Sequence, residues 1–231
     1  MSHGQSELVK QLLEDLIRLS PPDIEVLLTA NLPEDVNTYP TCPFPIRFIL
    51  NSEPKGFGAN HNAAFSVAEG QYFVVVNPDI RLSSLDFDVL LRPMEDAKVA
   101  AVAPVVVSAA GSIEDSVRRF PTVRRLARRV FLRQRGADYV WKDSPIDVDW
   151  SAGMFIVFRS SAYQAVNGFD DRRFFMYFED VDICDRLRSS GRRVVLQPSV
   201  TVVHDARRDS HRSLKHLRWH LTSAARYLTG I

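Results

Sequence analysis

The sequence predicts an α/β protein: a three-layer αβα sandwich around a mostly parallel central sheet, closed by a C-terminal helix. Two observations predict this fold class. Short apolar runs typical of buried strands alternate with segments whose apolar residues recur at helical spacing. The run 72–76 (YFVVV) is continuously apolar, as expected of a strand that is covered on both faces. With 231 residues, the chain is long enough for one such domain and its core.

The elements follow in order. A helix is expected over 5–19, where leucines recur at helical spacing until Pro21-Pro22 ends it. Strands are expected over 24–28, 46–50, 72–76, 99–107, 148–150, 154–158, 194–196 and 200–203, and helices over 59–68, 85–96, 180–190 and 214–228. We divide the chain into a sandwich domain, residues 1–205, and a basic helical extension, residues 206–231.

Composition excludes several classes of protein. The net charge of +1 gives no overall preference for nucleic acid or for membrane. The two cysteines match no metal-binding spacing, which favours a reduced, cytoplasmic setting. The first residues read as polar helix rather than signal peptide. The most apolar stretch, 99–107, is far shorter than the ~20 residues of a membrane span. We therefore expect a cytoplasmic protein whose only membrane contact is peripheral, at the inner face.

Polar residues follow two of the expected strands at their carboxyl ends, where open α/β sheets bind ligands. Asn77-Pro78-Asp79 comes directly after the strand 72–76, and His204 ends the strand 200–203. A divalent cation bridging Asp79 to a diphosphate would offset the cost of a carboxylate at this place, and oxygen ligands suit Mg²⁺ or Mn²⁺. The alternative is that Asn-Pro-Asp is only a good turn sequence and His204 a structural histidine.

Glu179 and Asp180 lie between an aromatic run, 174–178, and the helix expected over 180–190. Acidic residues are favoured at the start of a helix, so capping alone explains one of them. Two adjacent carboxylates beside aromatic rings also suit a general base aimed at a hydroxyl group. Spacing by itself favours capping.

Two further segments have unusual composition. Gly56-Phe57-Gly58 before a helix resembles a loop that cradles phosphate, or else a tight turn. The stretch from Val117 to Arg135 holds eight arginines and no acid, with apolar residues on one helical stripe. A basic amphipathic helix over Arg118–Arg135 would suit an anionic membrane surface. A solvated helix is the alternative, whereas sparse aromatic residues argue against nucleic acid.

Taken together and in order, several motifs resemble the family 2 glycosyltransferases, an inverting group with the GT-A fold, and in particular their bacterial rhamnosyltransferase-like branch. The motifs are NSEPKGFGANHN (51–62), YFVVVNPD (72–79), RRFPT (118–122), DWSAG (149–153), GFDDRRFFMYFEDVDICDR (168–186) and PSVTVVH (198–204). They cover most of the chain.

The resemblance implies a role for each matched position. Asp79 would bind the metal, with Asn77 in place of the first acid of the usual Asp-x-Asp and His204 completing the shell. Asp180 would be the catalytic base and Glu179 its neighbour on the acceptor side. The site residues also divide by the substrate that they would contact. The sugar-donor set is Asn31, Lys55, Gly56, Asn60, Asn77 and Asp79, and the acceptor set is Trp150, Gly153 and Glu179.

The chain departs from the family pattern near its start. Family members begin with a central apolar strand, and here most of that first strand is missing before Met1-Ser2-His3-Gly4. Thr29-Ala30-Asn31 stands where the family often has an aspartate that reads the nucleotide base, so Asn31 is the candidate for that contact.

The resemblance implies transfer of a sugar, such as rhamnose, from a dTDP- or UDP-linked donor to a hydroxyl of a cell-surface glycan or polyprenyl-linked acceptor. Asp180 would accept the proton while the acceptor attacks from the opposite face. The missing strand keeps a second hypothesis open, that of a catalytically silent nucleotide-sugar-binding or scaffolding homologue. A nucleotidyltransferase is disfavoured by the pairing of Asn77-Pro78-Asp79 with the late Glu179-Asp180.

Overall fold

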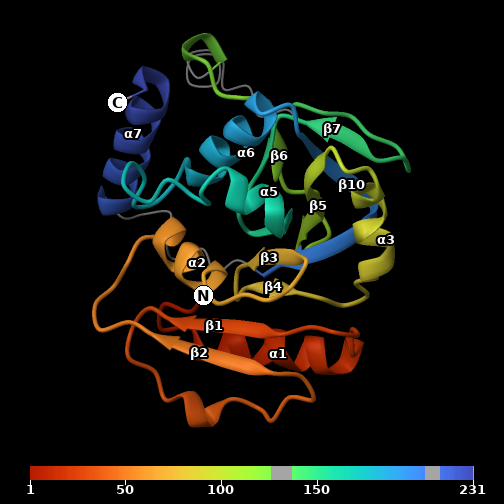
Figure 1. Ribbon diagram of the computed structural model, residues 1–231, viewed down its shortest axis with the longest axis vertical. Helices are drawn as coiled ribbons and strands as arrows, with labels where there is room; N and C mark the ends of the chain where they lie inside the picture. The colour runs from red at the N-terminus through yellow and green to blue at the C-terminus, as the bar shows by residue number, and fades with distance from the viewer. Residues whose placement is uncertain (126–136, 206–213, 231) are drawn as a thin grey trace.

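The computed structural model of the chain describes residues 1–125, 137–205 and 214–230 (Figure 1). The strands are β1 (Val26–Ala30), β2 (Ile46–Leu50), β3 (Tyr72–Val76), β4 (Ile80–Arg81), β5 (Val99–Ser108), β6 (Val117–Arg118), β7 (Ile146–Val148), β8 (Trp150–Ser151), β9 (Phe155–Arg159) and β10 (Arg193–His204). The helices are α1 (Ser6–Leu19), α2 (Phe57–Phe65), α3 (Phe87–Leu91), α5 (Ser160–Ala165), α6 (Glu179–Ser189) and α7 (Leu214–Thr229), with 3₁₀ helices at Val36–Thr38 and Arg92–Glu95.

The central sheet has the order β3-β9-β5-β10-β4, with β7 paired to β10. The prediction of a mostly parallel sheet is wrong. Within the described residues of this sheet only β5 and β10 run parallel, whereas β9 is antiparallel to β3 and β5, and β4 and β7 are antiparallel to β10. A continuously apolar run indicates that both faces of a strand are covered, and it carries no information about the direction of its neighbours.

Strand β10 joins two segments that the sequence predicts as separate strands. Its register against β5 shifts between Gln197 and Thr201, so Pro198 lies in an irregularity of the ladder. Proline lacks an N–H donor and is tolerated at such a bulge. The two apolar runs are therefore one bent strand.

The three layers are confirmed by alternation along the strands. Phe73, Ile156 and Val194 pack in one apolar cluster with α2, α5 and α6. Their neighbours Val74, Val157 and Val195 pack in a second cluster with α1, α3 and the 3₁₀ helix Arg92–Glu95. Successive strand residues point to opposite faces, so the two clusters are the two covered faces of the sheet.

The first two strands stand apart from this sheet. Among the described strands, β1 and β2 pair only with one another, in parallel (Figure 1), and Ala30 of β1 also forms an isolated parallel bridge with Ser2. An open cavity of about 710 Å³ lies between β1 and β3, lined by residues of both strands and of α1 and α2. Within the described residues, β1 and β3 therefore do not pair with one another.

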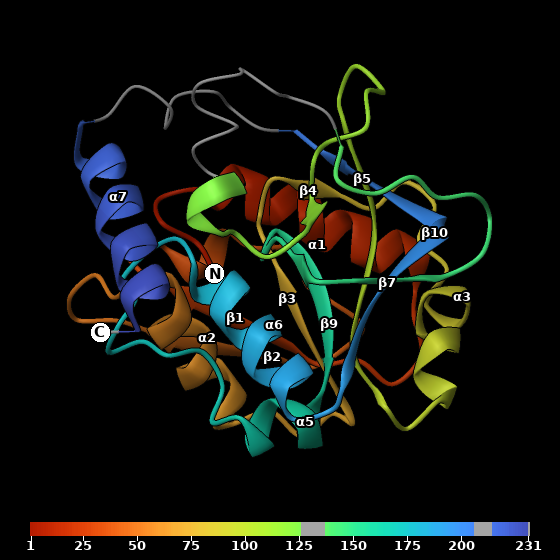
Figure 2. The same ribbon diagram turned by 90° about the horizontal axis from the view of Figure 1, so that it is seen from above.

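Helix α7 packs on the segment before α6, at the outer edge of the molecule, and α6 lies between it and the central sheet in both views (Figures 1 and 2). Its Tyr227 contacts the Phe178 ring and donates a hydrogen bond to Asp185. No helix in the described ranges is both long and apolar enough to cross a membrane.

The expectation of one basic helix from Val117 to Arg135 is partly wrong. Val117 and Arg118 form β6, which pairs with β8, and a helical turn starts only at Val123. Pairing with Trp150 and Ser151 overrides the helical spacing of this part of the stretch. The remainder of the predicted helix, 126–135, lies outside the described residues.

Candidate active site

The predicted site residues gather at one end of the central sheet. β3 and β10 both finish there, and β9 begins there, because Val76 pairs with Phe155 and His204 pairs with both Ile80 and Ser108. The turn Ala152–Met154 links these ends: its Met154 carbonyl accepts a hydrogen bond from the Asn77 amide. The co-location expected from the strand-end rule is thus confirmed.

Asn77-Pro78-Asp79 forms a turn in which the Ile80 amide donates to the Asn77 carbonyl. The turn also holds Asp79 where its carboxylate is mostly buried, with 17% of the side chain exposed. Oδ2 lies 3.3 Å from Nε2 of His204, whereas Oδ1 is buried and has no hydrogen-bond partner in the described part of the chain. A buried carboxylate oxygen without a partner is costly unless a ligand satisfies it.

His204 lies between two carboxylates. Its Nδ1 is 2.8 Å from Oε2 of Glu114, on the side opposite Asp79. Asp79, and then Glu114, raise the pKa of His204 to about 9, even though burial acts to lower it. Glu114 is itself held by the sheet, because its amide donates to the Val106 carbonyl. Glu114 therefore fixes the orientation of the imidazole, leaving Nε2 to face Asp79.

Asp180 lies in the first turn of α6, facing the turn before β9. Its Oδ2 accepts a hydrogen bond from the Gly153 amide at 3.1 Å, and its Oδ1 accepts one from the Val181 amide. Burial raises the pKa of Asp180, while these bonds and the guanidinium of Arg118 favour the ionised form. Gly153 has little room for a side chain, since a Cβ would lie 3.0 Å from the Phe57 ring.

Glu179 is 5% exposed, and its Oε2 has no hydrogen-bond partner among the described residues. Burial and the neighbouring Asp180 raise its pKa well above the usual range of a glutamate.

The two residues before Glu179, Tyr177 and Phe178, have φ of 69° and 68°. Left-handed conformations of non-glycine residues cost of order 1–3 kcal/mol each and persist where the surrounding fold imposes them. The left-handed conformation of Tyr177 and Phe178 therefore sets the direction in which the first turn of α6 points Glu179 and Asp180.

The predicted donor loop is built on an amide network. Oδ1 of Asn31 accepts hydrogen bonds from the Lys55 amide and from Asn51, which also donates to Oδ1 of Asn60. Asn31 and Asn60 are 3% and 1% exposed. Both side chains are engaged with protein atoms, so they shape the loop from within.

Gly56 is required by a contact with the aromatic segment. The Phe57 amide donates to the Phe175 carbonyl, and a Cβ on Gly56 would collide with that same carbonyl oxygen. The loop 51–56 is therefore tied directly to the segment that leads into Glu179 and Asp180.

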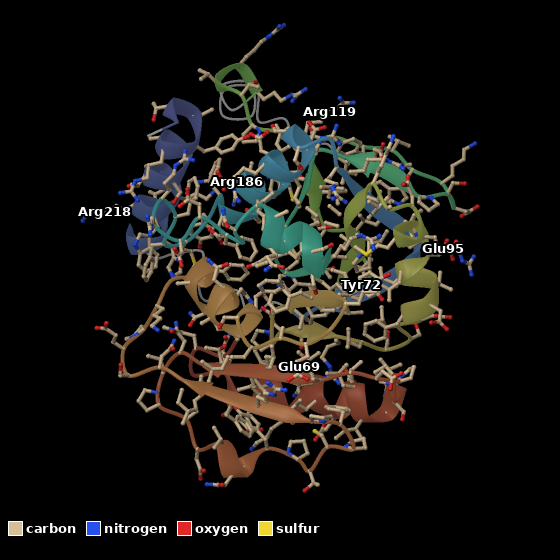
Figure 3. The ribbon with its side chains drawn as sticks, in the orientation of Figure 1. Glu69, Tyr72, Glu95, Arg119, Arg186 and Arg218 are labelled. Atoms are coloured by element: carbon tan, nitrogen blue, oxygen red, sulfur yellow. The ribbon has the colours of Figure 1, made fainter. Side chains whose placement is uncertain are left out.

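Trp150 lies on β8, beside the start of α6. Its Nε1 donates to the Arg119 carbonyl, and its ring packs with the apolar cluster of Phe174, Phe178 and Val181. Arg119, labelled in Figure 3, stacks over the Tyr139 ring near the top of that view. The neighbouring Arg118 pairs with Asp115. Trp150 is half-buried and lies shortly before the turn that contains Gly153, another predicted acceptor residue.

Two residues of this site are not predicted from the sequence. Glu114 is 90 positions from His204, in a loop without regular structure, and no local pattern marks it. Arg118 belongs to a stretch whose high arginine content suggests a surface role, yet its charge acts on Asp180.

The cluster fits a divalent cation in part. In the ranges that the structure describes, no three His, Cys, Asp or Glu side chains are grouped to hold an ion by themselves. The unpartnered Oδ1 of Asp79 is nevertheless available as a ligand, and Nε2 of His204 would become one when a cation displaces its proton. Mg²⁺ commonly binds one or two carboxylates and completes its shell with water and substrate phosphates.

The sequence was compared with known families and proteins. A sequence model described as glycosyltransferase like family 2 matches residues 4–222. Rhamnosyltransferase WbbL of Escherichia coli K12 is 30% identical over 247 residues, covering 99% of this chain and 90% of that protein. The N-acetylglucosaminyl-diphospho-decaprenol L-rhamnosyltransferase of Mycobacterium tuberculosis H37Rv is 30% identical over 168 residues, and the match covers 68% of this chain but only 54% of that enzyme.

Solved structures show the same fold. The mannosyltransferase PcManGT from Pyrobaculum calidifontis, in complex with GDP-Man and Mn²⁺, has a TM-score of 0.62 and 18% identity, over 97% of this chain and 62% of that one. GalNAc-T7 with UDP, GalNAc and Mn²⁺ has a TM-score of 0.60 and 11% identity, over 80% of this chain and 38% of that one. The family match and the fold agree with the motifs of the sequence, and the chain belongs to glycosyltransferase family 2, with the GT-A fold and rhamnosyltransferases among its relatives.

Proposed function

We propose that this protein is an inverting transferase that moves a sugar from a nucleotide-diphosphate donor to an acceptor hydroxyl, with Asp180 as the base. One observation carries the proposal: the Asp180 carboxylate is held by the Gly153 amide at the sheet end that also holds Asp79 and His204. A base, and at the same edge a group that can hold a cation against a diphosphate, are what transfer from a diphosphate donor requires.

The donor diphosphate would lie over the carboxyl ends of β3 and β10. Asp79 and His204 would hold Mg²⁺ or Mn²⁺, with Asn77 a weaker ligand, and that ion would offset negative charge on the departing diphosphate. Lys55 and Gly56 belong to a loop whose shape is set from within by Asn31 and Asn60. We assign this loop to the nucleotide side.

Asp180 and Glu179 would divide the acid–base work. Burial raises the pKa of both acids. The Gly153 and Val181 amides donate to Asp180, whereas Oε2 of Glu179 has no partner among the described residues, so Asp180 would carry the charge and Glu179 would stay neutral. Asp180 takes the proton of the acceptor hydroxyl as its oxygen attacks the anomeric carbon. The bond from that carbon to the diphosphate breaks on the opposite face, and the configuration inverts.

The donor that we favour is dTDP-rhamnose, because two relatives are rhamnosyltransferases by name. The name of the mycobacterial relative describes a decaprenol-linked acceptor, so we extend the proposal to a glycan or lipid-linked acceptor on the Trp150 side.

A lipid-linked acceptor calls for contact with a membrane surface. Helix α7 exposes Leu217 and Leu221, and Arg218 projects outward beside them (Figure 3). Exposed leucines next to basic residues suit peripheral contact with anionic lipid. The protein would then work at the inner face of the membrane.

Calorimetry with dTDP and UDP, each with and without Mn²⁺, tests the donor side. We expect Mn²⁺-dependent binding of one nucleotide, and transfer to an extract of native membranes detected by mass spectrometry with the matching sugar donor. Binding without transfer from any donor would favour the silent homologue. If neither nucleotide binds in a Mn²⁺-dependent way, the assignment of this site to a nucleotide-sugar donor is contradicted.

A further inference from the structure

The residues directly before α6, 173–178, form neither helix nor strand and lie along α7 (Figures 1 and 2). We call them the entry segment. They lead straight into Glu179 and Asp180, so the path of their backbone decides where the first turn of α6 places these two acids. The element that holds the entry segment therefore also holds the Asp180 carboxylate against the Gly153 amide.

Helix α7 binds the backbone of the entry segment at its start and in its middle. Nη1 of Arg226 donates to the Arg173 carbonyl at 2.6 Å, and Nη2 of Arg173 donates in return to the Arg226 carbonyl at 2.9 Å. Oγ of Ser223 donates to the Met176 carbonyl at 2.8 Å. Ser223 is only 4% exposed, so water cannot readily take the place of this hydrogen bond when the hydroxyl is removed.

The side chains of the entry segment pack against the same helix. The hydroxyl of Tyr177 lies 2.8 Å from Nδ1 of His216, within hydrogen-bond distance. The ring of Phe178 contacts that of Tyr227, and the hydroxyl of Tyr227 donates to Asp185 of α6. The α7 residues in contact with the entry segment recur every three or four positions, which places them on one face of the helix: His216, Trp219, His220, Ser223, Arg226 and Tyr227.

These contacts converge on the strained part of the backbone. Tyr177 and Phe178 both have left-handed φ, which non-glycine residues keep only where the surrounding structure imposes it. Helix α7 contacts the side chains of both residues and binds the Met176 carbonyl immediately before them. It is therefore in a position to impose the conformation that aims the first turn of α6.

We propose that α7 is a clamp on the entry segment, and that Tyr177 and Ser223 are positioning residues that keep Asp180 at the Gly153 amide. The catalytic part of this inference rests on the proposed function, in which Asp180 is the base. When the clamp is loosened, Tyr177 and Phe178 can relax to ordinary backbone conformations, and the Asp180 carboxylate moves away from its place.

The donor side should be much less affected. The Phe175 carbonyl is also held by the Phe57 amide, so loosening is expected after this residue rather than in the loop 51–56. Asp79 and His204 contact one another at the end of β10, where Glu114 holds the imidazole. The clamp therefore acts on the step that needs the base and leaves nucleotide binding in place.

The test uses the double variant Tyr177→Phe/Ser223→Ala of the full chain. It removes the hydroxyl groups that join the entry segment to α7, while the aromatic ring and the shape of the helix are kept. Thr222→Ala is the matched control, because it removes a hydroxyl from the neighbouring, exposed position of the same helix.

Steady-state kinetics and calorimetry measure the effect on the reaction. We expect the double variant to lose about 10–100-fold in kcat, as is typical of a reacting group held out of place. KM for the donor and the Mn²⁺-dependent affinity for the nucleotide should stay within about twofold, which separates a lost transition-state contact from lost binding. An unchanged stoichiometry of nucleotide per chain shows that the loss of kcat does not come from unfolded protein. Thr222→Ala should match the parent protein throughout.

Hydrogen exchange tests the clamp without any reaction. In peptides that cover residues 174–182, we expect exchange at least about fivefold faster in the double variant than in the parent protein, and no change in Thr222→Ala. Parent-like exchange in the double variant would overturn the clamp, whatever the kinetics show. Faster exchange with an unchanged kcat, in a protein whose Asp180→Asn variant has lost transfer, would overturn the positioning role. If Asp180→Asn itself keeps normal turnover, the proposed base is wrong, and the exchange measurement still decides whether α7 holds the entry segment.

Discussion

The backbone amide of Gly153 donates a hydrogen bond to Oδ2 of Asp180, with 3.1 Å between the two atoms. This contact joins the turn before β9 to the first turn of α6. Since Met154 in the same turn binds the Asn77 amide, the candidate base and the candidate donor site share one short piece of backbone.

The first prediction concerns Asp180→Asn. Asparagine has nearly the same shape and can still accept the Gly153 hydrogen bond, but it cannot take a proton. We expect kcat for sugar transfer to fall by about 10²–10⁴, the usual contribution of a general base, with Kd for the nucleotide nearly unchanged. Steady-state kinetics and calorimetry measure the two quantities.

Asp88→Asn, at an exposed aspartate of α3, serves as the matched control and should retain full transfer. Near-normal turnover of Asp180→Asn would remove Asp180 from the role of base.

The second prediction concerns Glu114, which holds Nδ1 of His204 at 2.8 Å. Residues that orient a metal ligand typically contribute 10–100-fold to metal affinity or activity. We therefore expect Glu114→Ala to weaken Mn²⁺-dependent nucleotide binding by about this factor, and Glu114→Gln, which keeps an acceptor oxygen, to weaken it less. Calorimetry with Mn²⁺ gives the values. Unchanged affinity in Glu114→Ala would mean that Asp79 alone positions His204.

The sequence was enough to predict Asp79 and His204 as neighbours, because each follows a strand and the strands finish at one edge. It was not enough to predict Glu114, whose contact with His204 depends on a loop with no periodicity. The direction of β9 was also beyond reach, because an apolar run reads the same in both directions. In the sequence, Gly56 resembles part of a phosphate-binding loop. In the structure, glycine is required there because a Cβ would collide with the carbonyl oxygen of Phe175, which is more than a hundred residues away in the chain.

The third prediction separates two reasons for a glycine: a left-handed backbone conformation, and the lack of space for a Cβ atom. Gly168 has φ of 64°, and a Cβ there would collide with Oδ1 of Asn62, which accepts hydrogen bonds from Tyr163 and from the Phe169 amide. Gly191 has φ of 80° and open space around it. We expect Gly191→Ala to lower the free energy of unfolding by about 1–2 kcal/mol, the cost of the left-handed conformation alone.

Gly168→Ala should cost at least about 1 kcal/mol more, since a well-packed interior must also move to admit the methyl group. Chemical denaturation of both variants measures the difference. If both variants lose the same free energy of unfolding, the side chains of Asn62 and Tyr163 move aside for the added methyl group without a cost in stability.

The fourth prediction concerns pH and Asp15, which ties α1 to β4. Its two carboxylate oxygens accept hydrogen bonds from Arg81, at 2.7 and 2.9 Å, and from the Leu82 amide and Arg18. Burial acts to raise the pKa of Asp15, but Arg81 and these other donors lower it to about 2. Because the folded-state pKa lies below the unfolded value of about 3.9, the stabilisation is complete above pH 4 and is lost as the pH falls from about 4 to 2.

Asp15→Asn should therefore lower the free energy of unfolding by about 2 kcal/mol at pH 7 and flatten its dependence on pH between about 4 and 2. Glu14→Gln, at the exposed position next to it, is the matched control and should leave both the stability and its pH dependence in place. Urea denaturation at a series of pH values measures both variants. If Asp15→Asn keeps the full slope of the parent protein below pH 4, the acid sensitivity arises from other carboxylates, and the Arg81 pair contributes little to holding α1 against the sheet.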